Sequence, residues 1–195
     1  MTRQYQLKKR AERQNQTRQR IVEAAIDLHS TIGPAQTTIS AIAERAGVQR
    51  HTVYSHFPTE RDIGLACSGT YSSRHPLPDP EALLEIRDAE ARLRRALERL
   101  YRYYERHEGL LANVMRDAEI HELTREIAEL RNGPTMERYL GVLTAPFAVR
   151  AQRRKRLAAA VAVAIDFRTW QTLVRRHGLS HARAVDTAVA MVRCQ

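Results

Sequence analysis

The 195-residue sequence contains no long apolar run. The longest apolar stretch, from Leu157 to Ile165, is far shorter than the ~20 residues needed to cross a bilayer, and the first 20 residues lack the apolar segment of a secretory signal. Cysteine is scarce as well, because Cys67 and Cys194 lie far apart and neither belongs to a metal-binding or redox motif. We therefore expect a cytoplasmic protein with no disulfide framework and no membrane contact.

Motifs of common catalytic sites are also missing. The sequence has no GxSxG, no GxxxxGK[ST] and no HExxH. His121 has the acidic neighbours Asp117, Glu119 and Glu122, but their spacing does not fit a zinc-binding helix, and exposed helix faces often carry such acids. An enzyme is therefore the weaker alternative, and we expect no metal and no cofactor.

Positive charge, in contrast, is abundant and concentrated at the N-terminus. The formal net charge is +10, and the first 20 residues hold seven Lys or Arg side chains against a single acid, Glu12. We interpret residues 1–16 as a flexible basic arm. Such an arm suits a polyanion, although basic tails also bind membranes or keep a protein in solution.

The remaining sequence predicts an all-α fold in two domains. Apolar residues recur at helical spacing, and Gly and Pro are confined to a few breaks. The first helix should start near Thr17, bury one face that includes Ile32, and end at Gly33-Pro34. Three prolines between residues 76 and 80 mark a boundary between an N-terminal domain, 17–74, and a C-terminal domain, 79–195. The helices expected in the second domain span 81–107, 110–118, 123–130, 153–176 and 180–193, with a less regular piece after Gly133-Pro134.

Residues 38–57 have the pattern of a helix-turn-helix. Thr38 can cap a helix, and Gly47 can adopt the left-handed conformation of a tight helix stop. In the second helix Val53 and Phe57 share an inward face, whereas the outward face is polar. Any surface helix shows a polar face to water, but the turn, the two short helices and the basic arm together favour DNA binding.

We therefore assign DNA-contacting roles along this segment and the arm. Side chains at the start of a recognition helix approach base edges, which makes Arg50 a candidate for guanine, Gln49 for adenine and Thr52 for a thymine methyl group. Phosphate contacts position the protein without reading sequence. The complete candidate interface comprises Thr38, Gln49, Arg50, His51, Thr52, Tyr54, His56, Arg61, Lys8, Lys9, Arg10 and Arg18.

The stretch TTISAIAERAGVQRHTVYSHFPTERDIGLA, residues 37–66, closely resembles the DNA-binding domain of TetR/AcrR-family regulators. The resemblance implies a homodimer that binds a palindromic operator in double-stranded DNA, usually as a repressor, and is released by a small-molecule effector. It also implies that Thr38, Tyr54 and His56 contact phosphates, and that Gln49, Arg50 and Thr52 contact bases. Pro58 stands where the family often has Lys or Gly, and the nearest following basic residue is Arg61.

The C-terminal half is less distinctive. Residues 167–175 and the turn at Gly178 resemble the penultimate helix of such regulators, which implies a dimer interface formed by helices at about 153–176 and 180–193. Apolar residues on these helices can supply that interface, although an intrachain core would use the same side chains: Leu157, Val161, Ala164, Ile165, Val185, Ala188, Val189 and Val192.

An effector pocket is expected among the middle helices, with apolar walls and a few polar groups. The candidates are Tyr103, Tyr104, Asn113, Met115, Arg116, Asp117, His121 and Trp170. Neither the effector nor the direction of regulation follows from these residues. A DNA-binding architectural protein without an effector is the remaining alternative, and the large C-terminal half argues against it.

Overall fold

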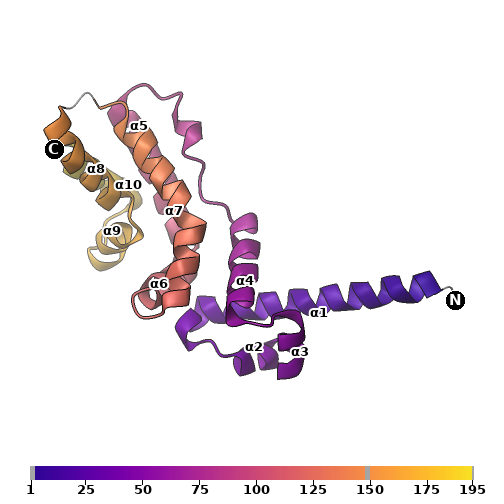
Figure 1. The fold of residues 1–195 in the computed structure, drawn as a ribbon. Coiled ribbons are helices and arrows are strands. Elements are labelled where there is room, and N and C mark those ends of the chain that lie inside the picture. Colours follow the sequence, from indigo (N-terminus) through magenta and orange to yellow (C-terminus); the bar gives the residue numbers. More distant parts are fainter. Residues whose placement is uncertain (1–2, 148–149, 195) are drawn as a thin grey trace. The chain divides into compact units, whose positions relative to one another are not determined.

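The structure, a computed structural model, describes residues 3–147 and 150–194. These residues form helices and connecting turns without any strand, which confirms the all-α prediction (Figure 1). In the described part, no single helix is long and apolar enough to span a membrane. The segments Arg153–Ile165 and Phe167–Arg176 have sufficient length and apolar character only when taken together, and they are bent by 61° relative to each other. The helical elements are α1 (Arg3–Thr31), η1 (Pro34–Gln36), α2 (Ile39–Ala46), α3 (Arg50–His56), α4 (Glu60–Arg74), η2 (Glu81–Leu83), α5 (Ala89–Arg106), α6 (Glu108–Asp117), α7 (Glu122–Thr144), α8 (Ala151–Ile165), α9 (Phe167–Trp170), the π-helical turn η3 (Gln171–Arg176) and α10 (His181–Arg193).

The chain forms two compact units that do not follow the sequence order. The first contains residues 1–76 together with 109–131, and the second contains 77–108 together with 132–195. Most of α6 and the first part of α7 thus pack with the N-terminal helices. The assignment of 79–195 to effector binding and dimerisation stays a prediction, but these residues do not form one separate structural unit.

Helix α1 is much longer than expected. It begins at Arg3 rather than near Thr17, so the part of the predicted flexible arm that the structure describes, 3–16, is helical. This stretch is rich in Arg, Gln and Lys and contains neither Gly nor Pro, so its intrinsic helix propensity is high even without an apolar face. Ile32 was also misplaced, because it is 42% exposed just beyond the end of α1.

The core of the first unit is built from α1, α2, α3 and α4. Ile21, Ala25 and Val53 are fully buried, and Phe57 is 1% exposed. Ile42 and Ala43 of α2 and Ile63 of α4 complete the same cluster. Burial of one apolar stripe from each helix fixes the positions of the short helices α2 and α3, which would be marginal in isolation.

In the second unit, α5 packs against α8 and α10. The apolar residues considered for a dimer interface are buried here within one chain; Val161, Ala164 and Ala188, for example, have no exposed surface. The intrachain-core alternative therefore accounts for them. Arg92 of α5 is 8% exposed and donates hydrogen bonds to the carbonyls of Leu84, Ile86 and Val142 at 2.7–3.1 Å.

Three further boundaries differ from the expected ones. The helix predicted from 81 starts at Ala89, and Asp88 caps it by accepting a hydrogen bond from the Ala91 amide. Helix α7 continues through Gly133 and Pro134, although proline removes one backbone hydrogen bond. The helix predicted over 153–176 is interrupted at Asp166, which ends α8 and caps α9.

Candidate nucleic-acid interface

The turn between α2 and α3 has the features expected of a helix-turn-helix. The Ala41 amide donates a hydrogen bond of 3.1 Å to Thr38 Oγ1, so Thr38 caps α2. Gly47 ends the helix with φ +63°, a left-handed conformation that side-chain-bearing residues rarely adopt. Its amide donates to Glu44 O, and the Val48 amide donates to Ala43 O, which closes the turn.

Helix α3 has one buried face and one exposed face. Val53 and Phe57 point into the core, whereas Tyr54 is 43% exposed. Gln49, at the N-cap, is also exposed, and so are Arg50 and His51; Thr52 and His56 are partly buried. The structure therefore brings together six of the predicted DNA-contacting side chains on or next to one seven-residue helix.

Arg61 lies in the first turn of α4, where a capping box fixes the helix start. Thr59 Oγ1 accepts from the Asp62 amide, and Asp62 accepts from the Thr59 amide. The Arg61 guanidinium forms an ion pair with Glu126 of α7, which raises the pKa of Arg61 and lowers that of Glu126. Arg61 is therefore exposed, but its positive charge is already paired with the carboxylate of Glu126.

The four basic residues predicted on the N-terminal arm lie along α1. Lys8, Lys9 and Arg10 are exposed on the part of the helix that projects beyond α3 (Figure 1). Arg18 behaves differently, because its guanidinium carbon lies 4.7 Å from the centre of the Phe57 ring. A cation–π contact of this kind stabilises the core edge and leaves Arg18 less available to DNA.

The C-terminal end of α1 is capped by side chains from α6. Asn113 Nδ2 donates to the carbonyls of His29 and Ser30 at 3.1 and 2.9 Å. Arg116 donates to Ile32 O at 2.9 Å. These carbonyls have no partner within α1, because the last turn of a helix lacks donors further along the chain. Helix α6 therefore holds the end of α1 from which η1 and α2 follow.

Asp117, next to Arg116, fixes the following turn. It is 1% exposed, accepts a hydrogen bond from the Ala35 amide and pairs with Arg116. Gly33 lies beneath this pair with φ +97°, and a Cβ at this position would collide with both Arg116 and Asp117. Position 33 thus requires glycine for two reasons: its backbone has a positive φ, and the contact between α6 and η1 leaves no space for a Cβ.

His29 of α1 lies close to the same site. Burial lowers the pKa of His29 to about 4, and the charge of Asp117 opposes that shift only in part. Its Nδ1 lies 3.5 Å from Sγ of Cys67, whose own pKa burial raises to about 11. Both groups are therefore neutral near pH 7, which fits a structural role.

The predicted effector residues are divided between the two units. Asn113, Met115, Arg116, Asp117 and His121 belong to the first unit, where three of them cap α1 or fix η1. Tyr103, Tyr104 and Trp170 belong to the second, where the Tyr104 hydroxyl donates to Ile165 O at 2.5 Å and Trp170 has no exposed surface. Their role in ligand binding stays a prediction.

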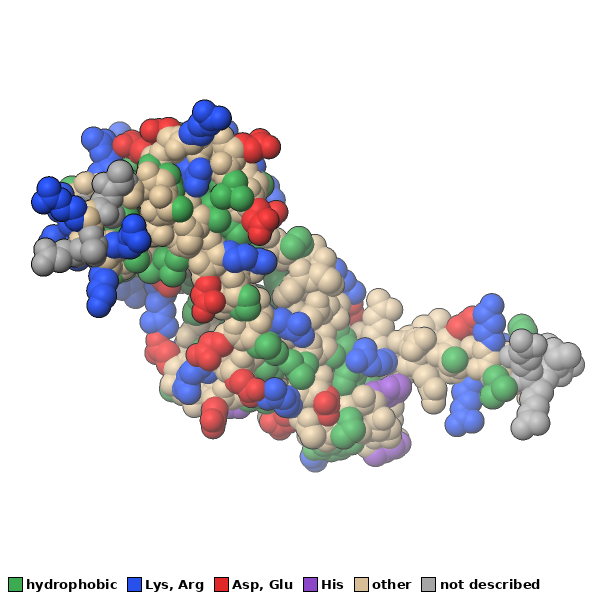
Figure 2. All heavy atoms as spheres, turned by 45° about the horizontal axis from the view of Figure 1, so that its top comes forward, with side chains coloured by type: hydrophobic (Ala, Val, Ile, Leu, Met, Phe, Trp, Pro, Cys, Tyr) green, Lys and Arg blue, Asp and Glu red, His purple; other side chains and the backbone are tan. Residues whose placement is uncertain are grey.

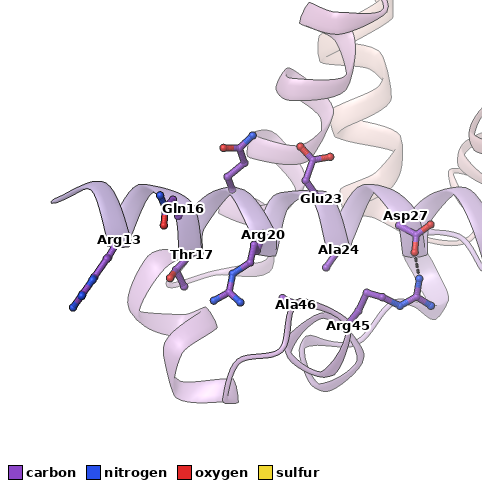
Figure 3. A pocket seen from close by; sticks show the side chains of 10 residues that line it. Arg13, Gln16, Thr17, Arg20, Glu23, Ala24, Asp27, Arg45 and Ala46 are labelled. Atoms are coloured by element: carbon purple, nitrogen blue, oxygen red, sulfur yellow. Dashed lines mark ion pairs between the residues drawn. The ribbon is translucent and has the colours of Figure 1, made fainter. Parts of the chain in front are cut away.

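The structure also shows a feature that sequence reasoning missed. An open groove of about 1000 Å³ lies between α1 and α2 (Figure 3). Three arginines, Arg13, Arg20 and Arg45, contribute to its walls, and none was among the predicted DNA contacts. The sequence did contain a signal for this pair, because residues seven apart, such as Arg13 and Arg20, share one face of a helix. That spacing is informative only if residues 3–16 are known to be helical.

Sequence comparison supports the assignment of this region. Residues 21–67 match the family described as bacterial regulatory proteins, tetR family, and the match covers α2, α3 and most of the core built around them. This N-terminal part of the chain is of the tetR type. The resemblance noted from residues 37–66 is thereby confirmed.

Two curated relatives match over about a third of the chain. The HTH-type transcriptional regulator SrpR and the uncharacterized HTH-type transcriptional regulator TtgW, both of Pseudomonas putida, are each 37% identical over 70 residues, or 36% of this chain. The matched segment spans only 32% of SrpR and 51% of TtgW. This similarity therefore supports the family assignment through part of the chain only.

Solved structures extend the likeness of fold to nearly the whole chain. NalD, the secondary repressor of the MexAB-OprM multidrug efflux pump in Pseudomonas aeruginosa, aligns with a TM-score of 0.65 at 23% identity over 93% of this chain and 96% of NalD. FadR from Bacillus subtilis, solved in complex with stearoyl-CoA, aligns with a TM-score of 0.60 at 16% identity over 89% of this chain and 96% of FadR. At these identities, the alignments establish the fold.

Proposed function

We propose that this chain is a sequence-specific DNA-binding repressor that acts as a homodimer on a palindromic operator. The observation that carries the proposal is the exposed polar face of α3, held by the buried Val53 and Phe57 and preceded by the tight turn at Gly47. Arg50, at the first position of α3, reads a guanine through two hydrogen bonds, and Tyr54 binds a phosphate.

Two substitutions on α3 test these two roles separately. Arg50→Ala is expected to reduce discrimination between the preferred duplex and random duplex by about 1–3 kcal/mol, because it removes a base contact. Tyr54→Phe is expected to weaken binding to both duplexes alike, since it removes only a phosphate contact. Equilibrium binding measured on both duplexes distinguishes the two patterns, and unchanged discrimination by Arg50→Ala contradicts its assigned role.

We further propose that a small-molecule effector releases the DNA, with α6 as the element that responds. Asn113, Arg116 and Asp117 connect α6 to the end of α1 and to η1, so a shift of α6 breaks hydrogen bonds that position α2 and α3. Trp170 is a candidate for contact with the effector, because its buried indole N–H has no acceptor in the part of the chain that the structure describes. An oxygen atom of the effector would supply one.

Trp170 also provides the measurement, because it is the single tryptophan of the sequence. Binding of an effector next to it is expected to change its intrinsic fluorescence in parallel with loss of DNA binding. Candidate effectors are compounds metabolised or exported by products of the genes next to the bound DNA. Release of DNA by an effector without any change in Trp170 fluorescence contradicts the proposed location, though not the proposed release.

For the dimer we propose the faces of α8 and α10 that remain exposed in one chain. Val163 is 48% exposed and Met191 is 40% exposed, and the alanines beside them allow close helix packing. Val163→Glu with Met191→Glu is expected to give a monomer in light scattering, because the paired faces would bury four carboxylates. Leu130→Glu, at an apolar residue of α7 that is 55% exposed, is the matched control and should leave the dimer intact.

A further inference from the structure

The projecting half of α1 has a basic face and a face of mixed charge. The side chains of Lys9, Arg13 and Arg20 lie within about 40° of one another around the helix axis, as calculated at 100° per residue. Glu12 and Lys8 lie to one side of them, together with Asn15 and Gln19. Basic side chains are visible along this projecting part in Figure 2. These three cations therefore form a strip, which we call the α1 strip: Lys9, Arg13 and Arg20.

The α1 strip leads into the groove between α1 and α2. Arg13, Thr17 and Arg20 extend from the side of α1 that faces Arg45 and Ala46, whereas Glu23 points the other way (Figure 3). The two acids that line the groove are already paired, Asp27 with Arg45 and Glu23 with Arg74. Within the described residues, Arg13 and Arg20 are thus left without an acidic partner in the groove.

The length of the strip fits a nucleic-acid backbone. From Lys9 to Arg20 the helix rises about 16 Å, over which B-DNA presents roughly five phosphates on each strand. The first core residue of α1 is Ile21, so the whole strip precedes the part of the helix that packs against α2 and α4. A rigid helix holds these cations in a fixed register, which a flexible arm cannot do.

The same helix does not suit a membrane surface. An interfacial helix needs apolar side chains together on one face. The large apolar residues of this part are Tyr5 and Leu7, which are 50% and 60% exposed. They point about 160° apart around the helix axis. The charge pattern without an apolar face favours DNA over lipid.

We infer that the α1 strip and the adjoining groove bind the phosphate backbone of duplex DNA next to the bases that α3 contacts. This inference rests on the proposed DNA-binding function and extends its contact surface to Arg13 and Arg20. The protein then covers a longer stretch of duplex than the base pairs that α3 alone contacts.

The test compares single charge removals in the full chain. Arg13→Gln and Arg20→Gln should each reduce the slope of log K against log salt by about 0.9, the value for one phosphate contact on B-DNA. Arg102→Gln removes the same charge from an exposed position of α5, outside the candidate interface, and should leave the slope unchanged. Circular dichroism checks that each variant stays folded, which is expected because Gln is a good helix former.

A second measurement uses duplexes of two lengths. On a duplex cut to the bases contacted by α3, wild type and Arg13→Gln should bind equally, whereas on a longer duplex the wild type should bind more tightly. Equal effects of Arg102→Gln and Arg13→Gln overturn the inference, since they indicate diffuse attraction by net charge. Unchanged slopes for both arginine variants overturn it too, whereas failure of the wild type to bind any duplex would contradict the proposed function itself.

Discussion

The Ala35 amide donates a hydrogen bond of 2.9 Å to Oδ2 of Asp117, although the two residues are 82 positions apart. Asp117 is 1% exposed and belongs to α6, whereas Ala35 belongs to η1, directly before α2. This bond, with those from Asn113 and Arg116, makes α6 part of the same compact unit as the helix-turn-helix. Any movement of α6 consequently changes the support of α2.

Removal of the Asp117 carboxylate should destabilise this unit. Asp117→Ala leaves the Ala35 amide without its acceptor and Arg116 without its partner, and each lost bond costs about 1–3 kcal/mol. Thermal unfolding should show a clearly lower Tm. Glu129→Ala removes an exposed carboxylate of α7 and is the matched control, for which Tm should hardly change. Equal Tm values for the two variants would show that the buried contact contributes nothing.

Glycine-to-alanine substitutions separate conformational strain from lack of space. Gly47 and Gly33 both have positive φ, but a Cβ at Gly47 meets no atom within 4 Å, whereas one at Gly33 meets Arg116 and Asp117. Gly47→Ala should cost about 1–2 kcal/mol from strain alone. Gly33→Ala should cost more, and chemical denaturation measures both. The order of the two losses is the decisive result, and a reversed order contradicts the close packing at η1.

Stability should depend on pH through His29. Its pKa is about 4 in the folded chain and near 6.5 when unfolded, so the unfolded state binds the proton more tightly. Stability is therefore fully present above pH 6.5 and falls as pH drops from about 6.5 toward about 4, by up to about 3 kcal/mol. Urea denaturation between about pH 4 and 7.5 should show this decline, and the His29→Gln variant should lack that part of it. Identical pH profiles would contradict the burial of His29.

Core and surface positions of α3 should respond in opposite ways. Phe57→Ala removes a buried ring and the contact with Arg18, and should destabilise the chain by about 3–5 kcal/mol. Tyr54→Ala lies one turn earlier on the exposed face and should change the free energy of unfolding by less than about 1 kcal/mol while it weakens DNA binding. Loss of folding in Tyr54→Ala would assign that side chain to the core instead.

The sequence predicted the helix-turn-helix well because its signals are local. Thr38 caps α2, Gly47 ends it, and Val53 and Phe57 pack into the core, all within one short segment. Signals that depend on distant partners were not accessible in this way. The contacts of Asn113 and Arg116 with the end of α1 depend on tertiary packing and were therefore not predicted, whereas the role of these residues in effector binding stays a prediction. The helix over residues 3–16 was missed because an apolar period, the main sign used for helices, is absent where a helix projects into solvent.

Selection of bound duplexes from a random-sequence pool tests the central claim, that the exposed face of α3 reads DNA sequence. The wild type should enrich an inverted repeat whose half-sites are centred about 10 base pairs, or a multiple of that, apart. Arg50→Ala should enrich a motif that has lost its preference at one base pair of each half-site. A wild-type pool that remains random after repeated rounds would contradict the claim.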